Sequence, residues 1–196
     1  MRTNFMKMIG LALFITLIIP AGMLFAKESV PASSLTSKTA NWYDVDQASN
    51  LLNRMQVLAV NTRNALGQNQ VAETDLAWQI QALNLDTAKS NVNRMGADLL
   101  RLDEISSKVE PWQQRLVHKV TPQVHEMAYQ LDAAINTLNE YQSKDRLALT
   151  QYPQNINQVC RNANLVSGTI SSVTRYARSE QKVAALHKLN DTNTGS

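Results

Sequence analysis

Apolar residues recur every three or four positions from residue 45 to residue 187, and this spacing predicts long amphipathic helices. We expect four of them, over residues 41–66, 70–109, 111–149 and 153–188. Gly67 follows the first segment, Pro111 opens the third and Pro153 opens the fourth, at positions where helices commonly end or begin. With 6 Gly and 5 Pro in 196 residues, the chain has few of the turns that an all-β fold needs. The pattern therefore predicts an all-α protein.

The repeat within each segment stays close to 3.5 residues, the period of helices that supercoil around a shared seam. The three later segments have similar lengths and short connections, which suit up-and-down antiparallel packing. One amphipathic helix cannot bury its own apolar stripe, whereas four helices around one axis can. We therefore expect residues 41–189 to form an elongated four-helix bundle with coiled-coil-like packing. In the fourth segment the expected seam consists of Ile156, Val159, Ala163, Val166, Ile170, Val173, Ala177, Glu180, Ala184 and His187.

A second arrangement of the middle segments is left open by the spacing. The seam of the second segment, continued past Pro111, meets Gln113, Leu116 and Val120. Because a proline can kink a helix as well as end it, the second and third segments could form one kinked rod. A second chain would then complete the seam.

The first 26 residues have the order of a secretory signal peptide. Arg2 and Lys7 precede an uncharged apolar stretch over residues 8–19, and Pro20 then interrupts the helix. We expect cleavage after Ala26, although Leu24 is larger than the small residue preferred there. If cleavage fails, residues 8–26 could remain as a membrane anchor. Residues 27–40 are rich in Ser and Thr and predict a flexible linker, and residues 190–196 predict a disordered tail.

The charge balance of the exported part is close to neutral. The whole chain has 19 basic and 16 acidic residues, and removing Arg2 and Lys7 leaves 17 and 16, a net charge of +1. A net charge this small does not predict binding to nucleic acid. Cys160 is the single cysteine, so no intramolecular disulfide can form, and we expect a buried or half-buried thiol. A disulfide between two chains is the alternative.

Motifs that carry enzyme or cofactor chemistry are missing from the sequence. It contains no Glu-x-x-His pair, no Gly-rich phosphate loop, no Gly-x-Ser-x-Gly and no His-Glu-x-x-His. His118 and His125 lie two helical turns apart, about 10 Å, which is too far for one metal ion. We therefore expect no enzymatic activity, no metal and no cofactor.

The fourth segment carries a stripe of cations. Arg161, Arg175 and Lys182 share its outward face, Arg178 and Lys188 add to it, and Glu180 is the sole acid between residues 154 and 190. The stripe could contact an anionic surface or an acidic partner. An ordinary solvated helix face is the alternative interpretation.

These observations favour an exported, non-enzymatic bundle that acts as a structural, adaptor or partner-binding component of the cell envelope. The expected location is periplasmic or secreted, with membrane attachment only through a retained segment 8–26. Two alternatives stay open, a sensor-like periplasmic bundle that binds a small ligand or cofactor, and a membrane-active amphipathic protein. The sequence is also compatible with an oligomer of this chain.

Overall fold

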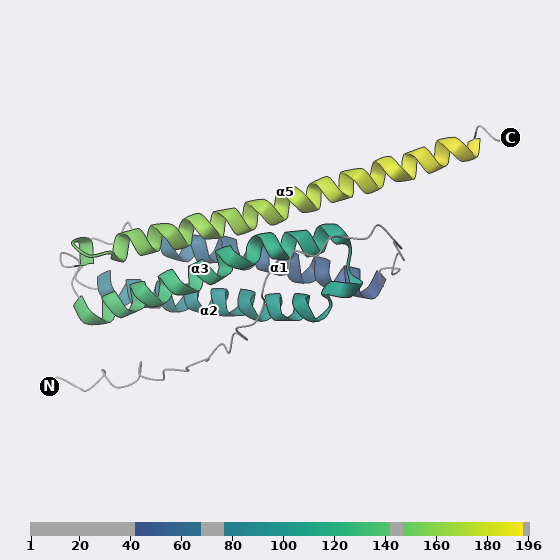
Figure 1. Ribbon diagram of the computed structural model, residues 1–196. Coiled ribbons are helices and arrows are strands. Elements are labelled where there is room, and N and C mark those ends of the chain that lie inside the picture. Colours follow the sequence, from purple (N-terminus) through teal and green to yellow (C-terminus); the bar gives the residue numbers. More distant parts are fainter. Residues whose placement is uncertain (1–41, 68–76, 142–146, 194–196) are drawn as a thin grey trace, which may run out of the picture. The chain divides into compact units, whose positions relative to one another are not determined.

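The computed structural model describes residues 42–67, 77–141 and 147–193 of the chain (Figure 1). The expected signal segment 1–26 and linker 27–40 lie outside these residues, as do residues 70–76 of the second expected helix.

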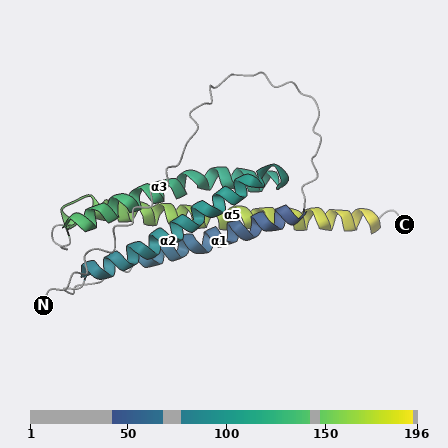
Figure 2. The same ribbon diagram turned by 90° about the horizontal axis from the view of Figure 1, so that it is seen from below.

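Four long helices make up the described residues, and no strand occurs among them. They are α1 (Trp42–Gly67), α2 (Ala77–Glu104), α3 (Pro111–Tyr141) and α5 (Tyr152–Asn193), with a short 3-10 turn, η2 (Ser106–Lys108), between α2 and α3. α1 and α3 each pack against both α2 and α5, so the helices form a ring in the order α1, α2, α3, α5. Figures 1 and 2 show that consecutive helices run in opposite directions. The predicted all-α four-helix bundle is confirmed.

The bundle interior is made by the apolar stripes that the spacing predicts. A single cluster of buried side chains runs through all four helices. Its members at predicted seam positions include Leu52, Met55, Leu85, Met95, Val124, Met127, Leu131, Val159, Val166 and Ile170. Removing these side chains from water is the main favourable contribution to folding, and it requires all four helices together.

The third helix is shorter than predicted. α3 ends at Tyr141. Leu147, which is buried, and Ala148, which is exposed, are helical, and residues 149–151 form a turn. The Thr150 hydroxyl donates to the Leu147 carbonyl at 2.7 Å and accepts the Tyr152 N–H at 3.2 Å. These local hydrogen bonds give the backbone an alternative to helix. The predicted end of the third helix at residue 149 is therefore wrong, because α3 ends at Tyr141 and residue 149 lies in a turn.

The fourth helix is longer than predicted, and its seam is shorter. Among the side chains of α5 that the structure describes, Ala177 is the last buried one, whereas Glu180, Ala184 and His187 are exposed. α5 continues to Asn193 and extends past the ends of the other helices (Figures 1 and 2). Residues 190–193, predicted as part of a disordered tail, are helical. The 3.5-residue spacing continues here although no other helix covers these positions. The spacing is a property of one helix and does not show whether another helix packs against it.

The structure decides between the two arrangements of the middle segments. α2 ends at Glu104, and α3 starts at Pro111 and packs back against α2, so they are separate helices and not one kinked rod. The Gln114 side chain donates from Nε2 to the Ser106 carbonyl at 2.7 Å and stabilises the turn between them.

Gln113 joins the start of α3 to α1. Its side chain is fully buried, and its Oε1 accepts the Glu110 N–H at 3.0 Å. This bond satisfies a free N–H at the helix start, as in one half of a capping box. Its Nε2 donates to the Val45 carbonyl at 2.9 Å and to Ser49 Oγ at 3.0 Å. One amide therefore connects helices that lie opposite each other in the ring.

We predict that Gln113→Leu lowers the free energy of unfolding by about 1–3 kcal/mol, because the Glu110 N–H loses its acceptor inside the protein. Denaturant unfolding followed by circular dichroism measures the change. Gln158→Leu, at an exposed position of α5, is the matched control and should shift the value by less than about 0.5 kcal/mol. Equal effects of the two substitutions would contradict the role given to Gln113.

Tyr152 begins α5 and points its ring into the bundle. The residue is buried, and its hydroxyl has no hydrogen-bond partner among the described residues. Burial raises the pKa of Tyr152 from 10.0 to about 12, because the phenolate is poorly solvated there.

The unfolded chain therefore releases the Tyr152 proton at lower pH than the folded chain. Stability from this group is complete below pH 10, falls as pH rises toward 12 and then levels off. We predict that Tyr152→Phe is neutral or stabilising by up to about 1 kcal/mol at pH 7, because no hydrogen bond is lost. Between pH 10 and 12 the wild-type chain should lose on the order of 1–3 kcal/mol more than the variant. The free energy of unfolding of both chains is measured in urea at each pH. If it changed equally with pH in both chains across this range, the raised pKa of Tyr152 would be contradicted.

Candidate functional site

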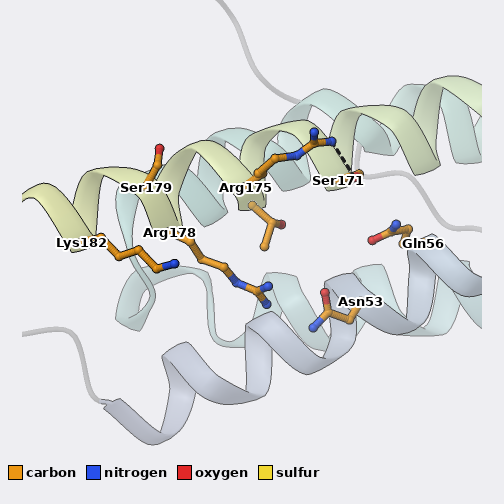
Figure 3. A pocket seen from close by; sticks show the side chains of 8 residues that line it. Asn53, Gln56, Ser171, Arg175, Arg178, Ser179 and Lys182 are labelled. Carbon is orange, nitrogen blue, oxygen red and sulfur yellow. Dashed lines mark hydrogen bonds between the residues drawn. The ribbon is translucent and has the colours of Figure 1, made fainter.

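A polar groove of about 470 Å³ lies between α1 and α5 (Figure 3). α1 contributes two amide side chains, and α5 contributes three cations and three hydroxyl groups. The lining residues are Asn53, Gln56, Ser171, Thr174, Arg175, Arg178, Ser179 and Lys182. No carboxylate belongs to this lining, so the groove presents hydrogen-bond donors and positive charge.

The helical repeat of α5 aims these side chains at one place. Ser171, Arg175, Arg178 and Lys182 follow one another at intervals of four, three and four residues, which puts them on one helix face. The buried residues Ile170 and Ala177 belong to a different face with the same spacing. One helix thus carries two stripes, an apolar stripe toward the core and a basic stripe along the flank of α1.

The three cations of the groove are held by few contacts. Arg178 extends from α5 toward α1, on the side where Asn53 lies (Figure 3). Arg175 instead bends back along its own helix and donates from a guanidinium N–H to Ser171 Oγ at 3.4 Å. Among the described residues no carboxylate lies within ion-pairing distance of Arg175, Arg178 or Lys182. Their donors are therefore available to an anion.

The acidic residues around the groove are not part of its lining. Glu180 accepts a hydrogen bond from the Tyr176 hydroxyl at 2.7 Å, and this bond raises the pKa of Tyr176. On α1, Asp44 is buried and Asp46 is exposed, seven residues before Asn53. The lining itself carries three positive charges and no negative one.

The structure groups three of the five predicted contact residues. Arg175, Arg178 and Lys182 line the groove. Arg161 is exposed on the same helix but lies fourteen residues before Arg175, about 21 Å along the axis, and is not part of the lining. Lys188 belongs to α5, and its side chain is outside the described residues.

Sequence reasoning missed the α1 side of the groove. Asn53 and Gln56 are ordinary polar residues of an amphipathic helix, and nothing in their spacing shows that α5 lies beside them. The pairing appears in contacts such as Arg63 Nη1 to Asn164 Oδ1 at 3.2 Å, which joins residues 101 positions apart. Antiparallel helices in this register bring Asn53 and Gln56 next to the basic stripe.

Other candidate residues take structural or surface positions. His118 and His125 are exposed, and no group of three His, Cys, Asp or Glu side chains that could hold a metal occurs in the part of the chain that the structure describes. Cys160 is a free, half-buried thiol that packs against the core, and burial raises its pKa. This environment keeps the thiol protonated and disfavours a nucleophilic role.

An ion pair between α1 and α2 was not predicted from the sequence. Arg54 donates two hydrogen bonds to the Asp98 carboxylate, one of them from Nε to Oδ2 at 2.7 Å. The Asp98 side chain is 3% exposed and that of Arg54 is 50% exposed. The hydrogen bond to Asp98 raises the pKa of Arg54. Because the carboxylate is satisfied within the bundle, this pair is a structural contact that orients α2 on α1.

We predict that replacing Arg175, Arg178 and Lys182 together by Gln changes the free energy of unfolding by less than about 1 kcal/mol, because these side chains make few contacts in the bundle. Ile170→Ala, one position from the groove stripe but fully buried, should cost about 2–5 kcal/mol. Thermal and urea unfolding of both variants provide the measurement. A large loss in the triple variant would assign the three cations to folding.

The groove thus combines guanidinium, ammonium, amide and hydroxyl donors from two helices, a set that can bind carboxylate, phosphate or sulfate groups. None of the helices among residues 42–67, 77–141 and 147–193 combines the length and apolar character required to cross a bilayer. Comparison of the chain with protein-family models, with curated proteins and with solved structures found no match.

Proposed function

We propose that this chain is an exported, non-enzymatic bundle that binds an anionic partner in the cell envelope through the groove between α1 and α5. The observation that carries the proposal is the lining of that groove, in which Arg175, Arg178 and Lys182 converge without a carboxylate. Cations without carboxylate partners in a hollow surface favour ligands of opposite charge.

Export rests on the first 26 residues. Arg2 and Lys7, the apolar stretch 8–19 and the small residue Ala26 have the order of a cleaved signal peptide. In this proposal residues 27–40 link the cleavage site to an elongated, up-and-down antiparallel bundle with coiled-coil-like packing. The processed chain works in the periplasm or outside the cell as an adaptor or structural component.

A second candidate function is binding of a small anionic ligand in a sensor-like bundle. The groove volume of about 470 Å³ favours it, because small-molecule sites have volumes of about 300–1,000 Å³. The open, polar lining is less typical of such sites, which are mostly apolar. Native mass spectrometry of protein purified from its own cells distinguishes the candidates, since a bound small molecule adds its mass to the chain.

We predict that chemical crosslinking in intact cells that produce the chain joins it to a partner in the envelope, and that its polypeptide begins at Lys27. Reversing the groove charges with Arg175→Glu, Arg178→Glu and Lys182→Glu should reduce the crosslinked product at least tenfold, because an anionic partner is then repelled. Quantitative mass spectrometry of the enriched chain measures both results.

The matched control reverses three exposed cations away from the groove, Arg94, Arg115 and Lys119 on α2 and α3. This triple variant changes the net charge by the same amount, so a general charge effect would lower the product equally in both variants. That result would contradict the role of the groove. An unprocessed cytosolic chain, or a purified chain that turns over a substrate, would contradict the wider proposal.

A further inference from the structure

The end of α5 leaves the bundle as a single helix. Every residue from Arg178 to His187 is exposed, and the figures show the C-terminal end of α5 running past the other helices (Figures 1 and 2). We refer to residues 178–187 as the projecting segment. α1 borders the first part of this segment, where Arg178 and Lys182 line the groove with Asn53 and Gln56.

The projecting segment continues the basic stripe and changes its chemistry. Four residues beyond Lys182 on the same face comes Leu186, and Val183 lies three residues before Leu186. Leu186 is 61% exposed and Val183 is 53% exposed. The stripe is therefore basic where α1 borders it and apolar where α5 stands alone.

We infer that the groove and the projecting segment together bind an acidic amphipathic helix of a partner protein. The inference rests on the proposed function of the groove and names the class of partner. The partner helix lies along α5, with its carboxylates toward Arg175, Arg178 and Lys182 and its apolar residues against Val183 and Leu186.

The spacing of the stripe favours a helix as the occupant. Side chains three and four residues apart on two packed helices meet at matching steps along both axes. A helix with acids at this spacing can pair with the three cations and then continue onto the apolar residues in register. An anionic polysaccharide or a free phosphate could pair with the cations, but neither would bury the exposed apolar side chains beyond them.

The shape of the groove disfavours a membrane surface as the occupant. Arg178 extends into a hollow whose other wall carries Asn53 and Gln56 (Figure 3). Side chains projecting from a helix can enter this hollow and bond to the amides, whereas the broad plane of lipid headgroups meets mainly the outermost side chains.

Charge also disfavours this chain as its own occupant. Residues 27–41 contain Lys27 and Lys38 against one acid, Glu28, so they do not complement a basic stripe. In a second copy the projecting segment has the same cations, and two such stripes side by side would repel. An acidic partner of different sequence fits the charge better.

The test places a photo-crosslinking amino acid at Ser179 or Val183 of the full chain, in cells that produce it. Tyr129, 69% exposed on α3, is the control position. Mass spectrometry identifies the linked peptide. The expected product, absent from the control, is one protein segment with Asp or Glu at three- and four-residue spacing beside a run of apolar residues.

A synthetic peptide of that segment then tests the two halves of the surface by fluorescence anisotropy. Affinity should fall at least tenfold with Val183→Ser and Leu186→Ser together, and at least tenfold with the charge-reversed groove. Val57→Ser with Leu100→Ser, at exposed apolar positions of α1 and α2, is the matched control and should bind normally.

Several results would overturn the inference. Crosslinks to lipid, to polysaccharide, to residues 27–41 or to a second copy each name a different occupant, and no crosslink above the control shows that the surface is unused. If the charge-reversed groove loses its envelope partner while the Val183 and Leu186 variant keeps it, the proposed function stands and the helical partner does not. If both variants keep the envelope partner, the proposed function and the helical partner are both contradicted.

Discussion

Burial of four apolar stripes in one interior is the constraint on which the structure depends. No helix of the bundle can remove its own stripe from water, so each one is stable because the others are present. A ring of helices meets this requirement, since each of α1, α2, α3 and α5 then has two neighbours. The same constraint holds the helices together without an intramolecular disulfide, which a chain with one cysteine cannot form.

Apolar contact alone leaves the register of long helices weakly specified, because sliding by one heptad presents a similar surface. Directional polar contacts supply what is missing. The Gln113 amide connects the start of α3 with Val45 and Ser49, and the Arg54 guanidinium binds the Asp98 carboxylate across α1 and α2. Each contact is satisfied at a single offset of the helices, so the buried polar groups act as markers of register.

α5 serves two purposes with one periodicity. Its core stripe ends at Ala177, while a second stripe of the same spacing carries the cations of the groove and continues onto the projecting segment. A helix face that the core does not need can vary in chemistry at little cost in stability. This separation explains how a bundle with a uniform interior can have a distinct binding surface.

The spacing of apolar residues was enough to predict the helical class, the four helices and most of the buried seam, because periodicity is a local property that each helix displays in its own sequence. It also predicted a basic stripe of five residues, of which Arg175, Arg178 and Lys182 line the groove and Arg161 does not. The amides Asn53 and Gln56 could not be predicted, since their role depends on which helix lies beside α1.

The ends of the elements were likewise decided by tertiary structure. α3 ends at Tyr141 although the spacing carried the third helix to residue 149, and Glu180 and His187 keep the seam spacing at exposed positions of α5. The sequence by itself therefore determined which residues would face a core if one were present. Only the packing of the four helices decided where that core stops and which surface remains open, because burial is a property of two surfaces and not of one.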